Sequence, residues 1–403
     1  MIQEQERKIL GFHRNVIAVG FVSLFMDISS QMIYPIVPLF LVSVIGANKA
    51  TIGLIEGIAE STASILKVFS GWLSDRLGKR KLLMGLGYGV SVLSRPILAQ
   101  SGTWGEVLTA RLIDRFGKGV RTAPRDAIIA DSAEHITLGR AFGLHRAMDT
   151  LGAVIGPGLA FLILYAFINN FRLVFWLSII PGMVAVFLII FFISEKARAK
   201  EELAKLPRLS LKVFDGRFRH YILVIVIFSI GNTSDAFLIL RAENLGISRE
   251  IIPITYLLFN VVYFSSSMPL GIMADRIGMK TMIAAGFLLY SLIYFGFAFA
   301  TQPNQIWLLF GLYGIFRGIS DGTQRAYLAT LAPSERRATA FGIYHMAVGI
   351  SLLPASIVGG LLWDRIGPEA TFLFGSLTAL VALIIFTLKK SPLQYGRETP
   401  SVR

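Results

Sequence analysis

The chain alternates between long apolar segments and short polar ones along nearly its whole length. Apolar runs long enough to cross a bilayer as a helix, about 20 residues each, occur for example at 221–240, 281–300 and 371–388. Charged residues, Gly and Pro divide the chain into twelve predicted spans, at 15–45, 51–73, 82–100, 104–128, 140–166, 172–193, 218–241, 250–271, 281–301, 305–329, 339–361 and 370–388. A single soluble core could not bury so many apolar runs. We therefore predict an all-α integral membrane protein with twelve transmembrane helices.

The fourth predicted span is supported by an internal repeat, because its row of charged residues would exclude it on hydropathy alone. The string GWLSDRLGKRK at Gly71 returns as GIMADRIGMK at Gly271, 200 residues later, and AFG at Ala141 returns at Ala340, 199 residues later. A duplicated six-helix unit makes the fourth span the counterpart of the tenth. The predicted organisation is an N-terminal bundle at 1–193, a cytoplasmic linker at 194–217, a C-terminal bundle at 218–390 and a cytoplasmic tail at 391–403.

Composition agrees with a membrane protein, and the placement of charge gives its orientation. The chain is 54% hydrophobic and 16% charged, with a formal net charge of +14. If the N-terminus is cytoplasmic, and the boundary residues Arg140, Arg172, Arg219 and Arg241 are counted with the loops, 24 of the 39 Lys and Arg lie inside, 5 in outward loops and 10 within spans. This is the positive-inside bias. It predicts that both termini are cytoplasmic and that the membrane is a cytoplasmic (plasma or inner) one, and it explains the basic charge without a nucleic-acid partner.

Two absences and one long segment narrow the class further. There is no cysteine, so neither disulfides nor thiolate metal sites form. The GK pairs at Gly78-Lys79 and Gly117-Lys118 lack the Ser or Thr of a P-loop, so we do not expect ATP hydrolysis. The first apolar segment is too long for a signal-peptide core, and we expect it to be a retained span.

The repeated string matches a known loop. The first copy holds Gly71, Asp75, Arg76, Gly78, Lys79 and Arg80, and the second holds Gly271, Asp275, Arg276, Gly278 and Lys280, with Met279 in place of Lys79. This pattern resembles the loop between the second and third helices of the major facilitator superfamily. The resemblance implies two pseudo-symmetric six-helix bundles and a conformational latch, with Asp75 near Thr339 and Asp275 near Arg140. A carboxylate there would face the positive N-terminus of a neighbouring helix. The alternative is an ordinary basic inside loop.

The fifth span carries a second resemblance. Gly143, Gly152, Gly156 and Pro157 keep the spacing of the superfamily's antiporter motif, although Ala160 and Phe161 replace its closing glycines. The resemblance implies export, of the kind found in the drug/proton antiporter branch. Close helix packing at the glycines is the alternative.

The fourth span has one charged face. Its charged residues fall within about 140° of a helical wheel; they are Arg111, Asp114, Arg115, Lys118, Arg121, Arg125 and Asp126. Arg111 and Gly117 resemble the family's fourth-helix pattern, with Asp114-Arg115 where the family has Gln-Gly. Ionisable groups at membrane depth tend to face a bundle interior or a wet cavity. We expect this of Arg111, Asp114 and Arg115, and we expect Arg121, Arg125 and Asp126 to be interfacial and structural.

The second span carries Glu56, Glu60 and Lys67 on one side. Lys67 lies about 10 Å from Glu60 along the helix axis, too far for contact, so we predict Arg111 or Arg115 as the partners of the two acids. The acids are either structural ion pairs or proton carriers.

The remaining candidates lie at mid-depth in other spans. The polar runs 27–31 and 231–235 interrupt apolar spans at corresponding places in the two halves, which points to a midplane site. His145, Asp149, Gly152 and Gly156 share a face of the fifth span. The proton or charge relay candidates are Asp27, Glu56, Glu60, Asp114, Asp149, Asp235 and Asp321. The substrate-cavity candidates are Gln31, Arg95, Arg111, Arg115, His145, Asn232 and Arg317.

These features predict a secondary transporter and not an enzyme. The leading hypothesis is a proton-coupled exporter of a small molecule, a monomer in the lipid bilayer that works by alternating access and uses the proton gradient without a cofactor. An importer or uniporter of an organic anion is the alternative, because the spans hold 10 basic residues against 8 acids. A divalent-metal exporter and a non-transporting receptor or lipid-moving scaffold are further alternatives.

Overall fold

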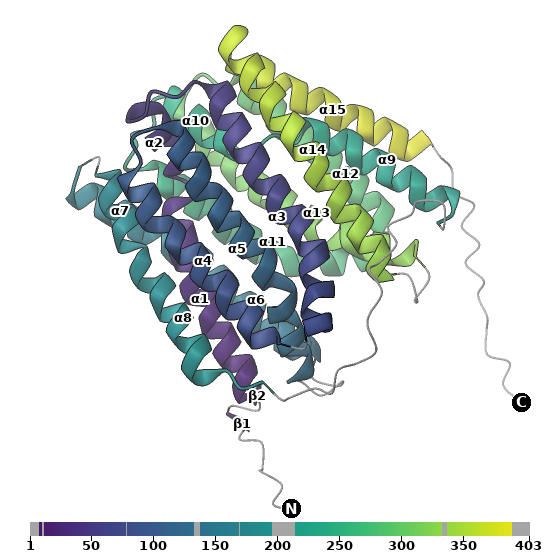
Figure 1. Cartoon of the computed structure of the whole chain (residues 1–403). Helices are drawn as coiled ribbons and strands as arrows, with labels where there is room; N and C mark the ends of the chain where they lie inside the picture. The colour runs from purple at the N-terminus through teal and green to yellow at the C-terminus, as the bar shows by residue number, and fades with distance from the viewer. Residues whose placement is uncertain are drawn as a thin grey trace, which may run out of the picture.

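The computed structural model describes residues 8–9, 12–77, 79–132, 138–168, 170–195, 214–332 and 337–388. Nearly all of this part of the chain is helical (Figure 1). Two short strands, β1 (Lys8–Ile9) and β2 (Phe12–His13), pair antiparallel just before the first helix. Most of the predicted linker and the tail lie outside the described residues.

In the described part of the chain the helices form twelve spanning units, as predicted, and three of these units are divided into two helices. The first half contains α1 (Arg14–Ile33), α2 (Val37–Ser43), α3 (Lys49–Leu77), α4 (Arg80–Gln100), α5 (Trp104–Asp131), α6 (Leu138–Ala166), α7 (Phe171–Leu177) and α8 (Ile179–Phe192). The second half contains α9 (Gly216–Gly231), α10 (Ala236–Asn244), α11 (Ile252–Ile277), α12 (Met279–Phe299), α13 (Pro303–Thr330), α14 (Arg337–Arg365) and α15 (Pro368–Leu388).

Hydropathy alone would have found only part of this set. Nine of the described helical segments are long and apolar enough to cross a membrane by themselves. The charged helices α3, α5 and α13 do not meet that criterion, although each is as long as its neighbours. Their place in the bundles is therefore decided by packing and charge pairing and not by apolarity.

The internal repeat predicted from sequence is confirmed by the helix boundaries. Helices α4, α5 and α6 begin at residues 80, 104 and 138, and α12, α13 and α14 begin at 279, 303 and 337, an offset of 199 in each case. The members of each pair also have equal lengths, of 21, 28 and 29 residues. Helix α5 is thus the counterpart of α13, as the repeat predicted.

The first and seventh spans are both broken, but the first breaks later than the polar run at 27–31. Helix α9 ends at Gly231 and α10 begins at Ala236, within the predicted polar run. In the first span, Asp27 and Gln31 lie on unbroken α1, and the break falls at 34–36. Pro35 and Pro38 cause it, because proline lacks the N–H that continues a helix.

The eighth span extends beyond its predicted end. Hydropathy placed its end at 271, whereas α11 continues to Ile277. Charged residues end an apolar run, but they do not end a helix. The helix stops at Gly278, whose φ of +97° favours glycine.

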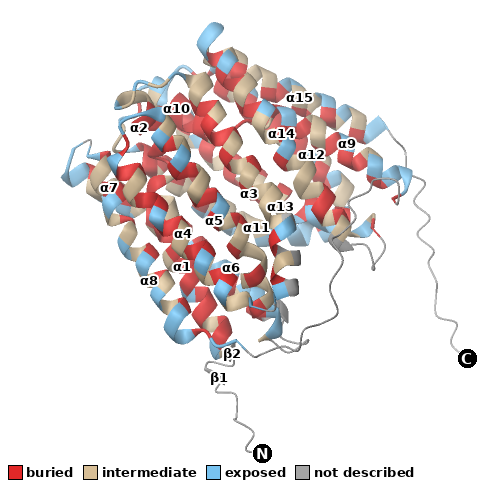
Figure 2. Ribbon diagram, viewed as in Figure 1, coloured by how far each residue is buried: buried red, intermediate tan, exposed pale blue. Residues whose placement is uncertain are grey.

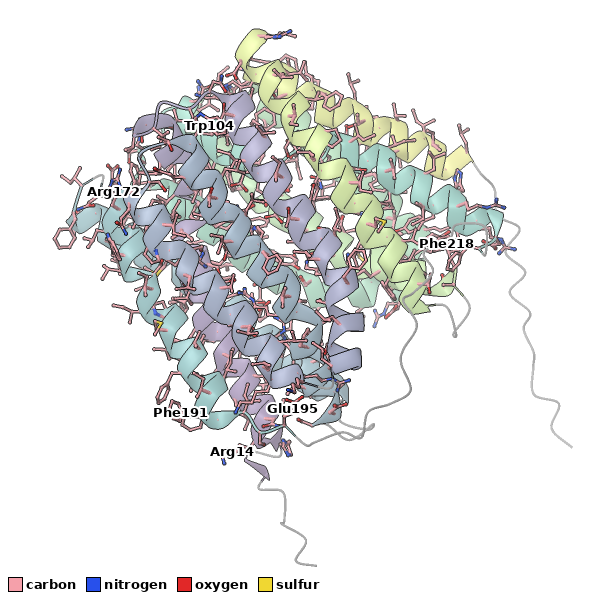
Figure 3. All side chains as sticks on the ribbon, viewed as in Figure 1. Arg14, Trp104, Arg172, Phe191, Glu195 and Phe218 are labelled. Atoms are coloured by element: carbon pink, nitrogen blue, oxygen red, sulfur yellow. The ribbon has the colours of Figure 1, made fainter. Side chains whose placement is uncertain are left out.

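The two bundles meet along α3 against α14 and α6 against α11. Figure 1 shows α3 and α14 side by side at the centre of the molecule. We call the end marked by Trp104 and Arg172 in Figure 3 the far end, and the end marked by Arg14 and Glu195 the terminal end. At the far end the carboxylate of Asp364 on α14 accepts hydrogen bonds from the backbone N–H groups of Lys49 (3.1 Å) and Ala50 (2.8 Å). One bundle therefore caps the first turn of a helix in the other.

Toward the terminal end the bundles separate. Helix α11 is buried or half-buried from Ile252 to Asn260, but between Val261 and Ile277 only Ala274 is buried (Figure 2). This half of α11 packs against α13 along one face, where Val262, Ser266 and Leu270 approach Gly314 and Gly318, and it is exposed on its other faces. The structure is closed at the far end and open at the terminal end.

We predict that Asp364→Asn weakens closure at the far end. The amide is a weaker acceptor than the carboxylate, and a helix cap contributes about 0.5–2 kcal/mol, enough to raise the open population several-fold. The cysteine-free chain allows a single Ser356→Cys reporter, at a site only 1% exposed in the α3–α14 seam. N-ethylmaleimide labelling from the far side should accelerate. Glu369→Gln, at the same end but paired with Arg241 of its own bundle at 3.6 Å, is the control. Equal labelling in both variants would contradict the prediction.

Candidate functional site

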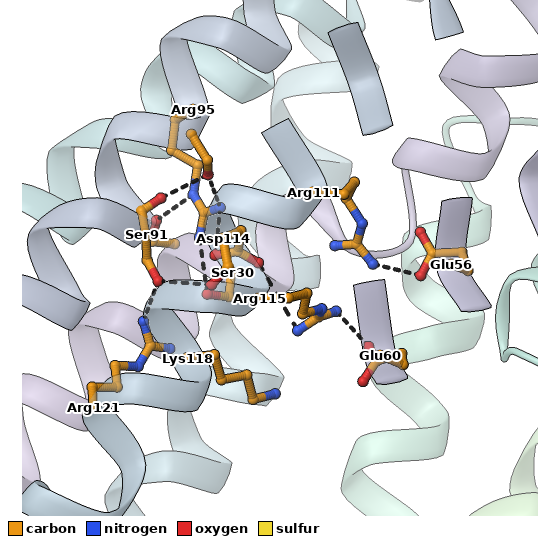
Figure 4. Close-up of polar contacts among 12 residues, drawn as sticks. Ser30, Glu56, Glu60, Ser91, Arg95, Arg111, Asp114, Arg115, Lys118 and Arg121 are labelled. Carbon is orange, nitrogen blue, oxygen red and sulfur yellow. Dashed lines mark hydrogen bonds and ion pairs between the residues drawn. The ribbon is translucent and has the colours of Figure 1, made fainter. Parts of the chain in front are cut away.

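Two buried ion pairs join α5 to α3, as the sequence predicted. Arg111 contacts the Glu56 carboxylate at 2.5 Å, and Arg115 contacts Glu60 at 2.7 Å (Figure 4). Glu56 and both arginines are buried, whereas the Glu60 side chain is 30% exposed. Burying a lone charge at membrane depth is costly. In each pair the acid and the arginine neutralise each other's charge, which lowers that cost.

A third pair lies deeper in the N-terminal bundle. Arg95 on α4 contacts Asp114 on α5 at 3.0 Å and is 1% exposed. Its guanidinium also donates to the hydroxyls of Ser94 at 2.9 Å and Ser30 at 3.0 Å. These bonds tie α4, α5 and α1 together, and they indicate a structural role for Arg95 and not a free cavity residue.

The lower charged residues of α5 differ from their prediction in one case. Arg121 was expected at the membrane interface, but it is buried, donates to Ser91 Oγ at 2.7 Å and lies over the Tyr88 ring at 4.4 Å. The predicted interfacial position was wrong because the approach of α4 covers this face, which a helical wheel does not show, whereas the contacts agree with the predicted structural role. Arg125 and Asp126 pair with each other at 2.9 Å on a more exposed part of the helix.

Tyrosine 34, which the sequence did not single out, lies where the two bundles meet. Its ring lies 5.7 Å from the Arg111 guanidinium and 5.8 Å from that of Arg115. On the other side it packs against Tyr256 of α11, with ring centroids 5.4 Å apart. An aromatic residue in an apolar span carries no sequence signal of such a role.

The predicted face of α6 packs on α1. A Cβ at Gly152 would lie 2.5 Å from the Leu24 carbonyl and 2.9 Å from Asp27 Cβ, and one at Gly156 would lie 2.8 Å from Gln31 Cβ. His145 Nε2 and Ser23 Oγ share a hydrogen bond of 2.7 Å. Gly152 and Gly156 therefore allow close packing within the N-terminal bundle, whereas a Cβ at Gly143, the third antiporter-like glycine, would meet nothing within 4 Å.

This packing brings two acids together. The carboxyl groups of Asp27 on α1 and Asp149 on α6 lie close enough to share a hydrogen bond. Asp149 also pairs with Arg146 at 3.1 Å. No basic side chain in the described part of the chain lies within 4.0 Å of Asp27. Gln31, one turn further on α1, has a buried Oε1 without a partner.

The C-terminal bundle has its own charged group at the α9–α10 break. Asp235 accepts a hydrogen bond from Tyr313 at 2.7 Å and lies 3.8 Å from Arg317. Arg317 also lies 3.9 Å from Asp321 and is 33% exposed. The Asn232 side-chain oxygen Oδ1 accepts a hydrogen bond from the Tyr290 hydroxyl at 3.2 Å, so its side chain is engaged in helix packing.

One chain of contacts joins the two charged groups across the bundle interface. Arg146 donates to the Tyr263 hydroxyl at 2.5 Å, and that hydroxyl donates to Asp321 at 2.8 Å. Arg146 is 54% exposed, so this connection borders the open side. Tyr263 was not predicted, because a lone tyrosine in an apolar span has no distinguishing pattern.

The loop motif is only partly described. Asp75 and Arg76 lie on α3, but nothing is described of their side chains, and Gly78 lies outside the described residues. Arg80 pairs with Asp131 on α5, and Glu195 accepts from the backbone N–H of Lys81 at 3.1 Å. Asp275 is exposed at the end of α11, and the side chain of Arg140 is not described. The latch contacts with Thr339 and Arg140 stay predictions.

Within the described ranges, no group of three or more His, Cys, Asp or Glu residues is placed to hold a metal ion.

Two bundles that enclose charged groups and open to one end define a multi-pass membrane transporter. Comparison with known proteins identifies its family. A sequence model described as the Major Facilitator Superfamily matches residues 19–240 and 221–403. An MFS-type transporter of Methanocaldococcus jannaschii is 38% identical over 381 residues, covering 93% of this chain and 94% of that protein. The chain belongs to the Major Facilitator Superfamily, whose members are secondary transporters and not enzymes.

Other similarities are more distant. A homologue of the multi-drug resistance efflux pump PmrA from Lactococcus lactis is 24% identical over 391 residues, covering 94% of this chain and 95% of that protein. The crystal structure of the nucleoside transporter NupG has the same fold, with a TM-score of 0.73 at 13% identity, over 93% of this chain and 99% of that one.

We predict that Gly152→Ala destabilises the N-terminal bundle while Gly143→Ala does not. The new methyl at Gly152 would meet backbone at 2.5 Å, whereas a Cβ at Gly143 meets nothing within 4 Å. Overpacking costs about 1–3 kcal/mol, and an unhindered Gly to Ala change in a helix gains up to about 1 kcal/mol. Thermal unfolding followed by tryptophan fluorescence should separate the two variants. Equal melting temperatures would contradict the packing account.

We predict that Glu56→Gln is more destabilising than the double variant Glu56→Gln with Arg111→Gln. Removing one partner leaves a buried, uncompensated charge, at a cost of about 3 kcal/mol or more, and removing both restores neutrality. Glu243→Gln, which breaks the more exposed 2.6 Å pair with Arg249, is the control, with an expected loss under about 1 kcal/mol. Thermal unfolding gives the comparison. A double variant as unstable as the single one would show that charge burial is not the cause.

Proposed function

We propose that this transporter exports a small molecule in exchange for protons, by alternating access. Secondary transport is the function of the family. The finer proposal rests on one observation, the adjoining carboxyl groups of Asp27 and Asp149 beside the opening between the bundles. The efflux-pump relative and the antiporter-like glycines of α6 support the outward direction.

The acid pair has the chemistry that coupling needs. Two ionised carboxylates in contact repel, so such a pair is stabilised by holding one proton between its members. The other acids of the N-terminal bundle are engaged differently, because Glu56, Glu60 and Asp114 each contact an arginine at 3.0 Å or less. A proton on those acids would break an ion pair. A proton on Asp27 would relieve a repulsion.

Arg146 links that proton to the arrangement of the bundles. Its guanidinium contacts Asp149 in its own bundle and Tyr263 in the other. When the terminal end closes and the far end opens, the contact across the interface changes, and so does the positive charge that Asp149 experiences. A proton affinity that differs between two conformations is the requirement for coupling.

A transporter of organic anions, working as an importer or uniporter, is the second candidate. The observation that favours it is the excess of basic over acidic residues in the spans, 10 against 8.

The test is substrate-dependent proton movement in proteoliposomes that contain a pH-sensitive dye. Ethidium, norfloxacin and naphthaleneacetate represent a cation, a zwitterion and an anion. We expect the wild type to exchange at least one of them for protons, and Asp27→Asn to lose proton movement while solute counterflow continues. Glu243→Gln is the control, because its carboxylate pairs with Arg249 at 2.6 Å in the C-terminal bundle. Solute transport without proton movement in the wild type, or coupling that survives Asp27→Asn, would overturn the proposal.

A further inference from the structure

Two lysines within the spans have no partner, unlike the other basic residues there. Eight in-span arginines contact an acid, a hydroxyl or a backbone carbonyl; they are Arg95, Arg111, Arg115, Arg121, Arg125, Arg146, Arg317 and Arg325. The ammonium groups of Lys67 on α3 and Lys118 on α5 make no hydrogen bond or ion pair with any described side chain or carbonyl. In Figure 4 no dashed line reaches the Lys118 ammonium.

The two lysines are close to each other and to the ion pairs. A Cβ at Gly119 would lie 2.5 Å from Leu66 Cβ, so the two helices approach closely one residue away from each lysine. Lys67 lies within electrostatic range of Lys118, Glu60 and Arg115. Both lysine residues are half-buried. Glu60 is already paired with Arg115, and Asp27, the other acid within electrostatic range of Lys118, adjoins Asp149, so neither lysine has a carboxylate in direct contact.

Neighbouring donors also lack acceptors. The Nε atoms of Arg111 and Arg115 are buried and have no hydrogen-bond partner. Arg111 is 3% exposed and Arg115 is 4% exposed. Unpaired cationic charge and unpaired N–H donors at one place are satisfied by the oxygens of an anion.

The opposite wall, in the C-terminal bundle, is aromatic and nearly neutral, and its rings at Tyr256, Phe259 and Tyr313 are buried in the packing of that bundle. The Phe259 ring lies 5.2 Å from Tyr256 and 5.3 Å from Tyr313, and Tyr313 lies 5.6 Å from Phe316. Arg317 there is balanced by two acids. Tyr256 of this wall is within electrostatic range of Glu60 and Arg115, so the wall faces the charged group of the N-terminal bundle.

We propose that Lys67 and Lys118 bind the negatively charged group of the transported solute, an organic anion whose flat aromatic body lies against the half-buried ring of Tyr263, which stacks on Phe259. This deepens the proposed export function by naming its substrate class. Aromatic rings attract one another in stacked and edge-to-face pairs, and lysine recognises a carboxylate, sulfonate or phosphate as a point charge. The N-terminal bundle supplies charge and the C-terminal bundle supplies apolar surface.

Binding to the purified full-length protein tests this inference without a proton gradient, so its outcome is separate from that of the Asp27→Asn experiment. The probes are naphthaleneacetate, naphthalenesulfonate and naphthyl phosphate, with neutral naphthaleneacetamide and cationic naphthylmethylammonium as matched ligands. We expect at least one anion to bind more tightly than both matched ligands, and to bind more weakly as salt rises. If none of the three anions binds, or if the acetamide binds as tightly as the acetate, the inference is overturned.

The variants locate the site. Lys118→Met and Lys67→Met should each weaken anion binding about tenfold, the loss expected for one charge-assisted contact, and Lys118→Arg should retain most of it. Lys49→Met, at the far end, is the control. Without ligand, Lys118→Met should unfold at a higher temperature than the wild type, because a half-buried charge without a carboxylate in contact is gone. Unchanged anion affinity in both Lys→Met variants would place the anion elsewhere and overturn the inference.

Discussion

The cost of holding charge inside a membrane-spanning bundle organises the N-terminal half of this protein. Helix α5 carries more charge than a lone transmembrane helix can tolerate, and it is accommodated because α3 and α4 present acids and hydroxyls to its guanidinium groups. Each arginine therefore favours the packing of one neighbouring helix, in the rotation that brings the acid or hydroxyl group of that helix into contact. The C-terminal half has fewer charged residues within its spans, and contacts between aromatic rings hold its helices together there.

Glycine contacts and charge pairs act together in this arrangement. The close approach of α6 to α1 at Gly152 and Gly156 leaves Asp27 and Asp149 adjacent, and it places Arg146 where it reaches the other bundle. The close packing of α6 on α1 thus creates a pair of carboxyl groups whose protonation depends on the charges around them. The seam between α3 and α14 holds the far end closed, and the terminal half of α11 is exposed on the faces that do not pack against α13. These differences between the two ends are what an alternating-access cycle would exchange.

The repeat explains why the two halves share a shape and differ in chemistry. Paired helices keep equal lengths and a constant offset in sequence, so each half forms the same bundle. The side chains that face the interface have diverged, with unpaired lysines on one side and stacked rings on the other. The proposed solute, with one anionic and one apolar part, would contact both faces.

The sequence by itself determined the helical class, the duplicated bundles, the charged face of α5 and the pairing of Glu56 and Glu60 with Arg111 and Arg115. Hydropathy, repeat spacing and helical periodicity are local properties of the chain, and they are enough for these conclusions. Only the tertiary structure decided that Arg121 is buried, that Tyr34 and Tyr263 join the bundles, and that Lys67 and Lys118 stay unpaired. These depend on which helix packs against which face, and side chains far apart in sequence supply the neighbours that a sequence pattern does not name.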